Sequence, residues 1–288
     1  MKFITVFTLT CATIIYSISA FADHHVNTVS QIKETGKIRI GYRQSEPPMS
    51  FVNKDGNPVG YSIDLCNYIV EELKNDLKSP NIKIEYIPVD AKDRFSAITE
   101  NKIDILCGST TKTLSRSKLV DFTQLTFITG ASLMTLKGQE FNDLAQLDDN
   151  KVGVVQNTTT LEHLEKLLKQ SYSLANVEQY KSAEQGLDAL RNGDIAAFAA
   201  DQVVLIGLAI SSPDGDKFSI SPNVFSYEPL ALATRRNDAE FIYIANSSIS
   251  KLSRNKQIFK LYGKWFSKFS EKRPPLIESL YKLNAIPE

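Results

Sequence analysis

Residues 37–43 read KIRIGYR, in which Ile38 and Ile40 alternate with Lys37 and Arg39. An alternation of apolar and polar residues with a period of two predicts a β-strand, here over residues 37–42. The segments after it predict a helix, a strand, a short helix and a strand, over residues 62–77, 82–89, 94–101 and 103–106. This β-α-β-α-β order is typical of a mainly parallel sheet that is covered by helices.

A second α/β unit follows in looser form. Its strands and helices are predicted alternately over residues 151–155, 159–170, 177–180, 183–191, 195–200 and 202–210. Extended apolar segments at 126–136 and 227–234 flank this unit. Two helices, at 238–253 and 256–269, follow, and a short tail is expected to pack against the rest.

The two flanking segments indicate a chain that leaves its first lobe and later returns to it. We therefore expect an α/β protein in which the second lobe is inserted in the first, with a two-strand hinge. Lobe 1 would comprise residues 23–130 and 233–288, and lobe 2 residues 131–232. Ligands of open α/β sheets bind outside the carboxyl ends of the strands. Two such lobes on a hinge would form a cleft that closes around a ligand.

Composition limits the possible functions. The chain has 288 residues with 33 basic and 33 acidic side chains, and this zero net charge argues against a nucleic-acid-binding protein. Residues 1–22 predict a secretory signal peptide, because Lys2 precedes an apolar run that ends in Ala-Phe-Ala at 20–22. The mature chain keeps Cys66 and Cys107, which either form a disulfide in an oxidising compartment or stay as two buried thiols.

The sequence contains little catalytic chemistry. It lacks the G-x-S-x-G, P-loop, H-E-x-x-H and C-x-x-C motifs, so we expect no cofactor, no metal site and no catalytic residue. Polar side chains gather instead where predicted strands end and predicted helices begin. These candidates, which would face one cleft, are Arg43, Arg94, Ser109 with Thr111, Arg116, Thr158 with Thr159, and Asp201.

These residue types suit a zwitterion that carries a further anionic group. Hydroxyls and N–H groups at a helix start, together with an arginine, bind a carboxylate. Asp201 would bind an ammonium group, and Arg43 and Arg94 are then left for a second anion. Taken singly, the hydroxyl residues and Asp201 are better explained as helix caps, and the arginines as surface residues. Taken together, they favour a binding site.

At these residues the chain resembles the periplasmic solute-binding proteins of ABC importers for polar amino acids, and within them the glutamate/aspartate-binding branch. The resemblance extends from about Val29 to Phe269. It rests on an ordered series of segments, which are GKIRIGYR at 36–43, PPMSF at 47–51, GYSIDLC at 60–66, CGSTT at 107–111, Arg116, VDF at 120–122 and KWF at 264–266. It implies a type II periplasmic-binding-protein fold.

The resemblance also implies a role for each candidate. The positions that hold the α-carboxylate and amine of the ligand correspond to Ser109, Thr111, Arg116, Thr158 and Thr159. Asp201 corresponds to the partner of the ammonium group, and Arg43 and Arg94 to the arginines that meet the side-chain carboxylate. A serine and a histidine of the branch are replaced here by Ala91 and Ala183. Both departures affect recognition of the ligand side chain.

Two further positions follow from the resemblance. Asn157 stands where a member of the family has glycine before the paired threonines. Cys66 would lie early in the first helix of lobe 1 and Cys107 at the end of its third strand, both on the cleft side. A disulfide between Cys66 and Cys107 is therefore a hypothesis.

We expect a periplasmic, monomeric receptor that closes around an acidic or polar amino acid and delivers it to an ABC permease. Glutamate and aspartate are favoured, and glutamine or a broader polar range stays open. The alternative is a periplasmic enzyme on the same scaffold, similar to cyclohexadienyl dehydratase, for which Glu46 is the nearby acidic candidate.

Overall fold

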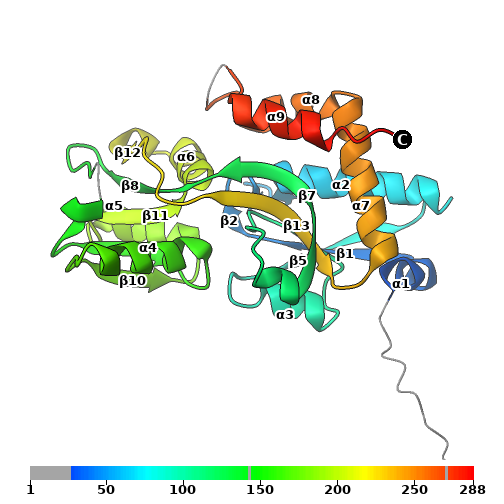
Figure 1. The fold of residues 1–288 in the computed structure, drawn as a ribbon, viewed down its shortest axis with the longest axis horizontal. Coiled ribbons are helices and arrows are strands. Elements are labelled where there is room, and N and C mark those ends of the chain that lie inside the picture. The colour runs from blue at the N-terminus through cyan, green and yellow to red at the C-terminus, as the bar shows by residue number, and fades with distance from the viewer. Residues whose placement is uncertain (1–26, 142–143, 270–271) are drawn as a thin grey trace, which may run out of the picture.

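The computed structural model describes residues 27–141, 144–269 and 272–288. These residues form two α/β lobes that lie side by side (Figure 1). The predicted signal peptide, residues 1–22, lies outside the described residues. Within the described ranges, no helix combines the length and the apolar character that crossing a bilayer requires.

Lobe 1 is built on a five-stranded sheet with the order β5-β1-β6-β13-β7. Its strands are β1 (Lys37–Tyr42), β5 (Lys83–Pro88), β6 (Ile105–Cys107), β7 (Val120–Thr129) and β13 (Glu228–Arg235). β1 runs parallel to β5 and β6, whereas β13 runs antiparallel to β6 and β7. The predicted mainly parallel sheet is therefore mixed, because β7 follows β6 without an intervening α-helix and β13 returns from the other lobe.

Helices and a small second sheet complete lobe 1. The helices are α1 (Thr28–Thr35), α2 (Tyr61–Asp76), α3 (Arg94–Thr99), α7 (Ala239–Arg254), α8 (Gln257–Phe266) and α9 (Pro275–Asn284). The small antiparallel sheet contains β2 (Ser45–Glu46), β3 (Ser50–Val52) and β4 (Pro58–Val59). Its strands were not predicted, because segments of two or three residues are too short to show an alternating pattern.

The C-terminal tail belongs to the core of lobe 1. The Tyr61 hydroxyl donates a hydrogen bond to the carbonyl oxygen of Thr126 at 3.0 Å and lies 2.9 Å from the Tyr281 hydroxyl. Ile277 and Leu280 of α9 are buried beside them. Figure 1 shows α9 lying next to α8 on the same side of the lobe.

Lobe 2 repeats the design of lobe 1. Its sheet has the order β10-β9-β11-β8-β12. The strands are β8 (Ala131–Leu136), β9 (Lys151–Val155), β10 (Asn176–Tyr180), β11 (Ala197–Asp201) and β12 (Phe218–Ile220). β9 is parallel to β10 and β11, and β8 is antiparallel to β11 and β12. The helices are α4 (Thr159–Gln170), α5 (Ala183–Asn192) and α6 (Gln202–Ser211).

Two strand-like crossings join the lobes, and they run side by side in Figure 1. β7 passes into β8 through Gly130, and the Ala131 N–H donates to the Ser226 hydroxyl on the returning chain at 2.9 Å. β13 pairs with β7 from Glu228 onward. The boundary predicted between residues 232 and 233 thus falls inside a strand of the first sheet. We propose that the lobes divide at residue 130 and within residues 221–227.

Candidate functional site

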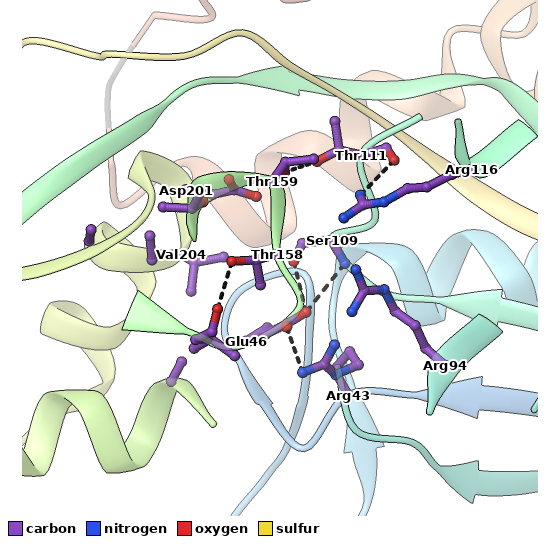
Figure 2. A pocket seen from close by; sticks show the side chains of 15 residues that line it. Arg43, Glu46, Arg94, Ser109, Thr111, Arg116, Thr158, Thr159, Asp201 and Val204 are labelled. Atoms are coloured by element: carbon purple, nitrogen blue, oxygen red, sulfur yellow. Dashed lines mark hydrogen bonds and ion pairs between the residues drawn. The ribbon is translucent and has the colours of Figure 1, made fainter. Parts of the chain in front are cut away.

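The eight residues selected from the sequence line one cavity between the lobes (Figure 2). Lobe 1 provides Arg43, Arg94, Ser109, Thr111 and Arg116, and lobe 2 provides Thr158, Thr159 and Asp201. The rest of the wall consists of Glu46, Val155, Thr160, Ala183, Ala199, Ala200 and Val204. The cavity measures ≈ 50 Å³. A single water needs about 10–15 Å³ on this scale, so the lobes lie close together around the space.

The topology explains why residues distant in sequence meet here. Tyr42 and Cys107 are directly paired in the parallel strands β1 and β6, so Arg43 and the residues after Cys107 leave the sheet at the same edge. A disulfide joins Cys107 to Cys66 on α2, with the Cα atoms 6.4 Å apart. On the other lobe, β11 ends at Asp201. The site therefore forms where the carboxyl ends of two sheets face each other.

Thr158 combines a structural position with a place in the cavity wall. Its hydroxyl accepts a hydrogen bond from the Leu161 N–H at 3.2 Å and donates to the carbonyl oxygen of Val155 at 2.7 Å. Thr158 is therefore the N-cap of α4, in agreement with the interpretation of this residue as a helix cap. Asn157 before it has φ 58°, a left-handed conformation that asparagine tolerates better than most residues. Asparagine can therefore stand where a relative has glycine.

Arg43, Glu46 and Ser109 form one compact cluster. Oε1 of Glu46 lies 3.1 Å from Nη2 of Arg43, and the Ser109 hydroxyl donates to Oε2 of Glu46 at 2.7 Å. Figure 2 shows Glu46 between the two other side chains. From the sequence, Arg43 is expected to meet the ligand, and Glu46 is a candidate only as the acid or base of an enzyme. In the structure the two residues pair with each other.

Arg94 and Arg116 differ from Arg43 because their guanidinium groups donate to backbone carbonyl oxygens. Arg94 is 4% exposed, and its Nη2 donates to the carbonyl oxygen of Asn157 in lobe 2 at 2.9 Å. Nη1 of Arg116 donates to the carbonyl oxygen of Thr111 at 2.9 Å. Within the part of the chain that the structure describes, neither guanidinium forms an ion pair with a carboxylate. Both guanidinium groups lie over the ring of Phe95, at 4.7 and 5.4 Å from its centre.

The electrostatics of these arginines favour an incoming anion. Burial, together with the nearby charges of Arg116 and Arg43, lowers the pKa of Arg94 from 12.5 to about 9. Burial also lowers the pKa of Arg116. A buried cation without a counterion is costly, and an opposite charge nearby stabilises its charged form. A carboxylate placed between these two side chains would supply that charge.

Asp201 is the complementary group on lobe 2. It stands at the start of α6, but its side chain makes no capping hydrogen bond, so the cap interpretation of this residue is wrong. It is 8% exposed. Burial raises its pKa well above the ordinary value, and the like charges of Glu228 and Glu46 raise the pKa further. An ammonium group in the cavity would stabilise the ionised form of this carboxylate.

Glu228 is a site residue that the sequence analysis missed. This fully buried carboxylate accepts hydrogen bonds from the hydroxyls of Thr111 at 2.6 Å, Thr159 at 2.7 Å and Ser226 at 2.6 Å. It thereby connects lobe 1, lobe 2 and the hinge. No sequence pattern could reveal it, since Thr111 and Thr159 lie 117 and 69 residues away along the chain.

Direct packing also joins the lobes. A Cβ atom on Gly207 of α6 would lie 2.1 Å from the carbonyl oxygen of Pro47 in lobe 1, so only glycine permits this approach. The hydroxyls of Thr111 and Thr159 lie 3.2 Å apart across the cleft. Over the described ranges, no group of three or more His, Cys, Asp or Glu side chains could hold a metal ion. The site is thus an arrangement of charged side chains from two lobes that contact each other directly.

Comparison with known proteins identifies the family. Residues 38–268 match the bacterial extracellular solute-binding proteins, family 3. The chain is 30% identical over 272 residues to the L-glutamate/L-aspartate-binding protein of Pseudomonas aeruginosa, an alignment that covers 92% of this chain and 90% of that protein. It is 29% identical over 240 residues to the glutamate/aspartate import solute-binding protein of Escherichia coli K12, with 83% and 80% covered.

A likeness to a solved structure agrees with this match. An ancestral arginine-binding protein bound to arginine has a TM-score of 0.72 and 28% sequence identity, over 80% of this chain and 98% of that one. The predicted two-lobed, type II periplasmic-binding-protein fold is confirmed. The family match extends over most of both lobes and includes every residue of the site described above. The chain therefore belongs to the bacterial extracellular solute-binding proteins, family 3.

Proposed function

We propose that this protein captures an acidic amino acid, glutamate or aspartate, between its lobes. One observation carries the proposal. The buried guanidinium group of Arg94 and the half-buried one of Arg116 face the buried carboxylate of Asp201 across one cavity, and none of the three forms an ion pair within the described chain. A molecule with two carboxylates and one ammonium group matches these charges one for one.

Each end of the ligand has a proposed partner. The α-carboxylate would lie against Arg116 at the amino end of α4, beside Thr111 and Thr159, whose hydroxyls donate to Glu228. The positive end of the helix dipole and its free N–H groups add to this attraction. The ammonium group would pair with Asp201. Thr158 would support this end of the site as the cap that orients α4.

The ligand side chain would extend toward Arg94. This guanidinium is repelled by Arg116, so an anionic side chain relieves that repulsion whereas a neutral amide does so only weakly. Ala91 and Ala183 leave no side-chain hydrogen-bonding group at the positions where the branch has serine and histidine. Selectivity for acid over amide would therefore depend mainly on charge.

Capture would proceed by hinge closure without covalent chemistry. Lobe 1 supplies both free guanidinium groups and lobe 2 supplies Asp201, so the complete set of charges assembles only when the lobes meet. The names of the relatives, which include an import protein, support delivery to an ABC permease. The predicted signal peptide supports a periplasmic location. An enzymatic role is less well supported, because Glu46, its candidate acid or base, is bound to Arg43 and Ser109.

The test is thermal melting of residues 23–288 against the twenty amino acids, after unfolding and refolding to remove carried-over ligand. A ligand at 100 times its dissociation constant stabilises by about 2.7 kcal/mol. In a protein of this size that is a rise of roughly 5–10 °C in melting temperature. We expect the rise with glutamate and aspartate. Glutarate and succinate, which lack the amine, serve as controls, and an equal rise with them would count against the role of Asp201.

A further inference from the structure

Glu46 differs from Arg94, Arg116 and Asp201 because both oxygens of its carboxylate have partners within the chain. Its side chain is 13% exposed and extends from β2 to the edge where β1 and β6 end. One carboxylate oxygen pairs with Arg43 at 3.1 Å. The other accepts a hydrogen bond from the Ser109 hydroxyl at 2.7 Å and a longer one from the Ser109 N–H at 3.4 Å. Both oxygens are thus used within lobe 1.

The charges of the cavity wall separate into two groups as a result. Arg43 and Glu46 neutralise each other, whereas Arg94 and Arg116 make their hydrogen bonds to backbone carbonyl oxygens. Arg43 is itself buried, with an exposure of 7%, so water cannot take the place of Glu46 beside its guanidinium group. A paired guanidinium attracts a further anion far less than an unpaired one, because its field is largely cancelled by the adjacent carboxylate.

We propose that Glu46 is a specificity-determining residue, a carboxylate of the protein that occupies Arg43 and Ser109 in place of a carboxylate of the ligand. The inference rests on the proposed function. Because Glu46 occupies Arg43, Arg94 is the cation that meets the ligand side chain. The site accordingly discriminates acid from amide less strongly than three free arginines would, and the residue that limits this discrimination is Glu46.

The first test removes the negative charge and keeps the shape. We would measure the dissociation constants of glutamate and glutamine by titration calorimetry for the wild-type protein and for Glu46→Gln. We expect the ratio of the glutamine constant to the glutamate constant to rise at least tenfold, because Arg43 becomes available to an anionic side chain. Glu72→Gln is the matched control, since Glu72 is also partly buried and paired, with Lys251, outside the cavity. Its ratio should not change.

A second variant removes both charges, so no unpaired charge is left buried. In Arg43→Gln combined with Glu46→Gln, glutamate should bind within about threefold of the wild-type value, because the pair contributes no net charge. A direct contact between Arg43 and the ligand would instead weaken glutamate by thirtyfold or more, and that result would overturn the proposal. An unchanged or lower ratio of the glutamine to the glutamate dissociation constant in Glu46→Gln would also overturn the proposed role of Glu46. In that case the proposed function stays intact as long as the wild-type protein binds glutamate. A wild-type protein that binds neither ligand would overturn the proposed function itself.

Discussion

Replacing Asp201 by asparagine should weaken amino-acid binding and, at the same time, stabilise the ligand-free protein at neutral pH. The carboxylate is 8% exposed and would be the partner of the ligand's ammonium group. Removal of one partner of a buried charge pair costs about 2–5 kcal/mol. The dissociation constants of glutamate and glutamine should therefore both rise, by about 30- to 4,000-fold.

The stability of the ligand-free protein should change in the opposite direction. Burial, Glu228 and Glu46 hold the pKa of Asp201 above its value in the unfolded chain, which is about 3.9. The favourable contribution of the protonated group is therefore complete below that value and is lost as the pH rises through the pKa of the folded state. Asparagine does not titrate, so the variant should gain stability relative to the wild type as the pH rises. An unsatisfied buried polar group costs about 1–3 kcal/mol and a charged one costs more, so the expected gain at pH 8 is at least about 1 kcal/mol.

Denaturant unfolding of the refolded proteins at pH 4 and pH 8, together with calorimetric titration of glutamate, measures both effects. The exposed Asp188 in the same lobe provides the matched control, and Asp188→Asn should change neither. Binding of glutamate by Asp201→Asn as tight as that by the wild type would contradict the proposed role of Asp201. A variant that is less stable at pH 8, relative to the wild type, than at pH 4 would contradict it equally.

Three further predictions concern lobe 1. Arg94→Gln should raise the dissociation constant of glutamate by thirtyfold or more, because a buried charge pair is lost, and that of glutamine by less than tenfold. Equal losses for the two ligands in calorimetry would contradict the role of Arg94 at the ligand side chain. Arg116→Ala should weaken both ligands to a similar degree, because the α-carboxylate is common to them, and a loss confined to glutamate would argue against this role. Cys66→Ser opens the link to Cys107 across 41 residues and should lower the free energy of unfolding by about 4 kcal/mol. A loss below about 1 kcal/mol in denaturant unfolding would contradict that estimate.

Local sequence patterns predicted most of the regular elements because those elements are long and half or fully buried. The strands at 37–42 and 151–155 and the helix at 159–170 have the predicted bounds. The orientation of β7 and β13 did not follow from these patterns. It depends on how the chain crosses between lobes, and periodicity within a segment carries no information on its neighbours in the sheet.

Only some features of the candidate site could be predicted from the sequence. Asp201 was found because it follows a buried strand, at the carboxyl end of a sheet where ligands of open α/β proteins bind. The pairing of Arg43 with Glu46 was not found, since it depends on the path of the loop that brings β2 back to β1. Glu228 was not found either, because its partners come from both lobes and are assembled only by the fold.

We propose that the cavity takes a molecule with two carboxylates and one ammonium group. Calorimetric titration of the refolded wild-type protein with glutamate, glutamine and glutarate at the same ionic strength tests it most directly, since each of the last two lacks one charge. We predict that glutamate binds at least tenfold more tightly than either. Glutamine or glutarate binding as tightly as glutamate would contradict the account.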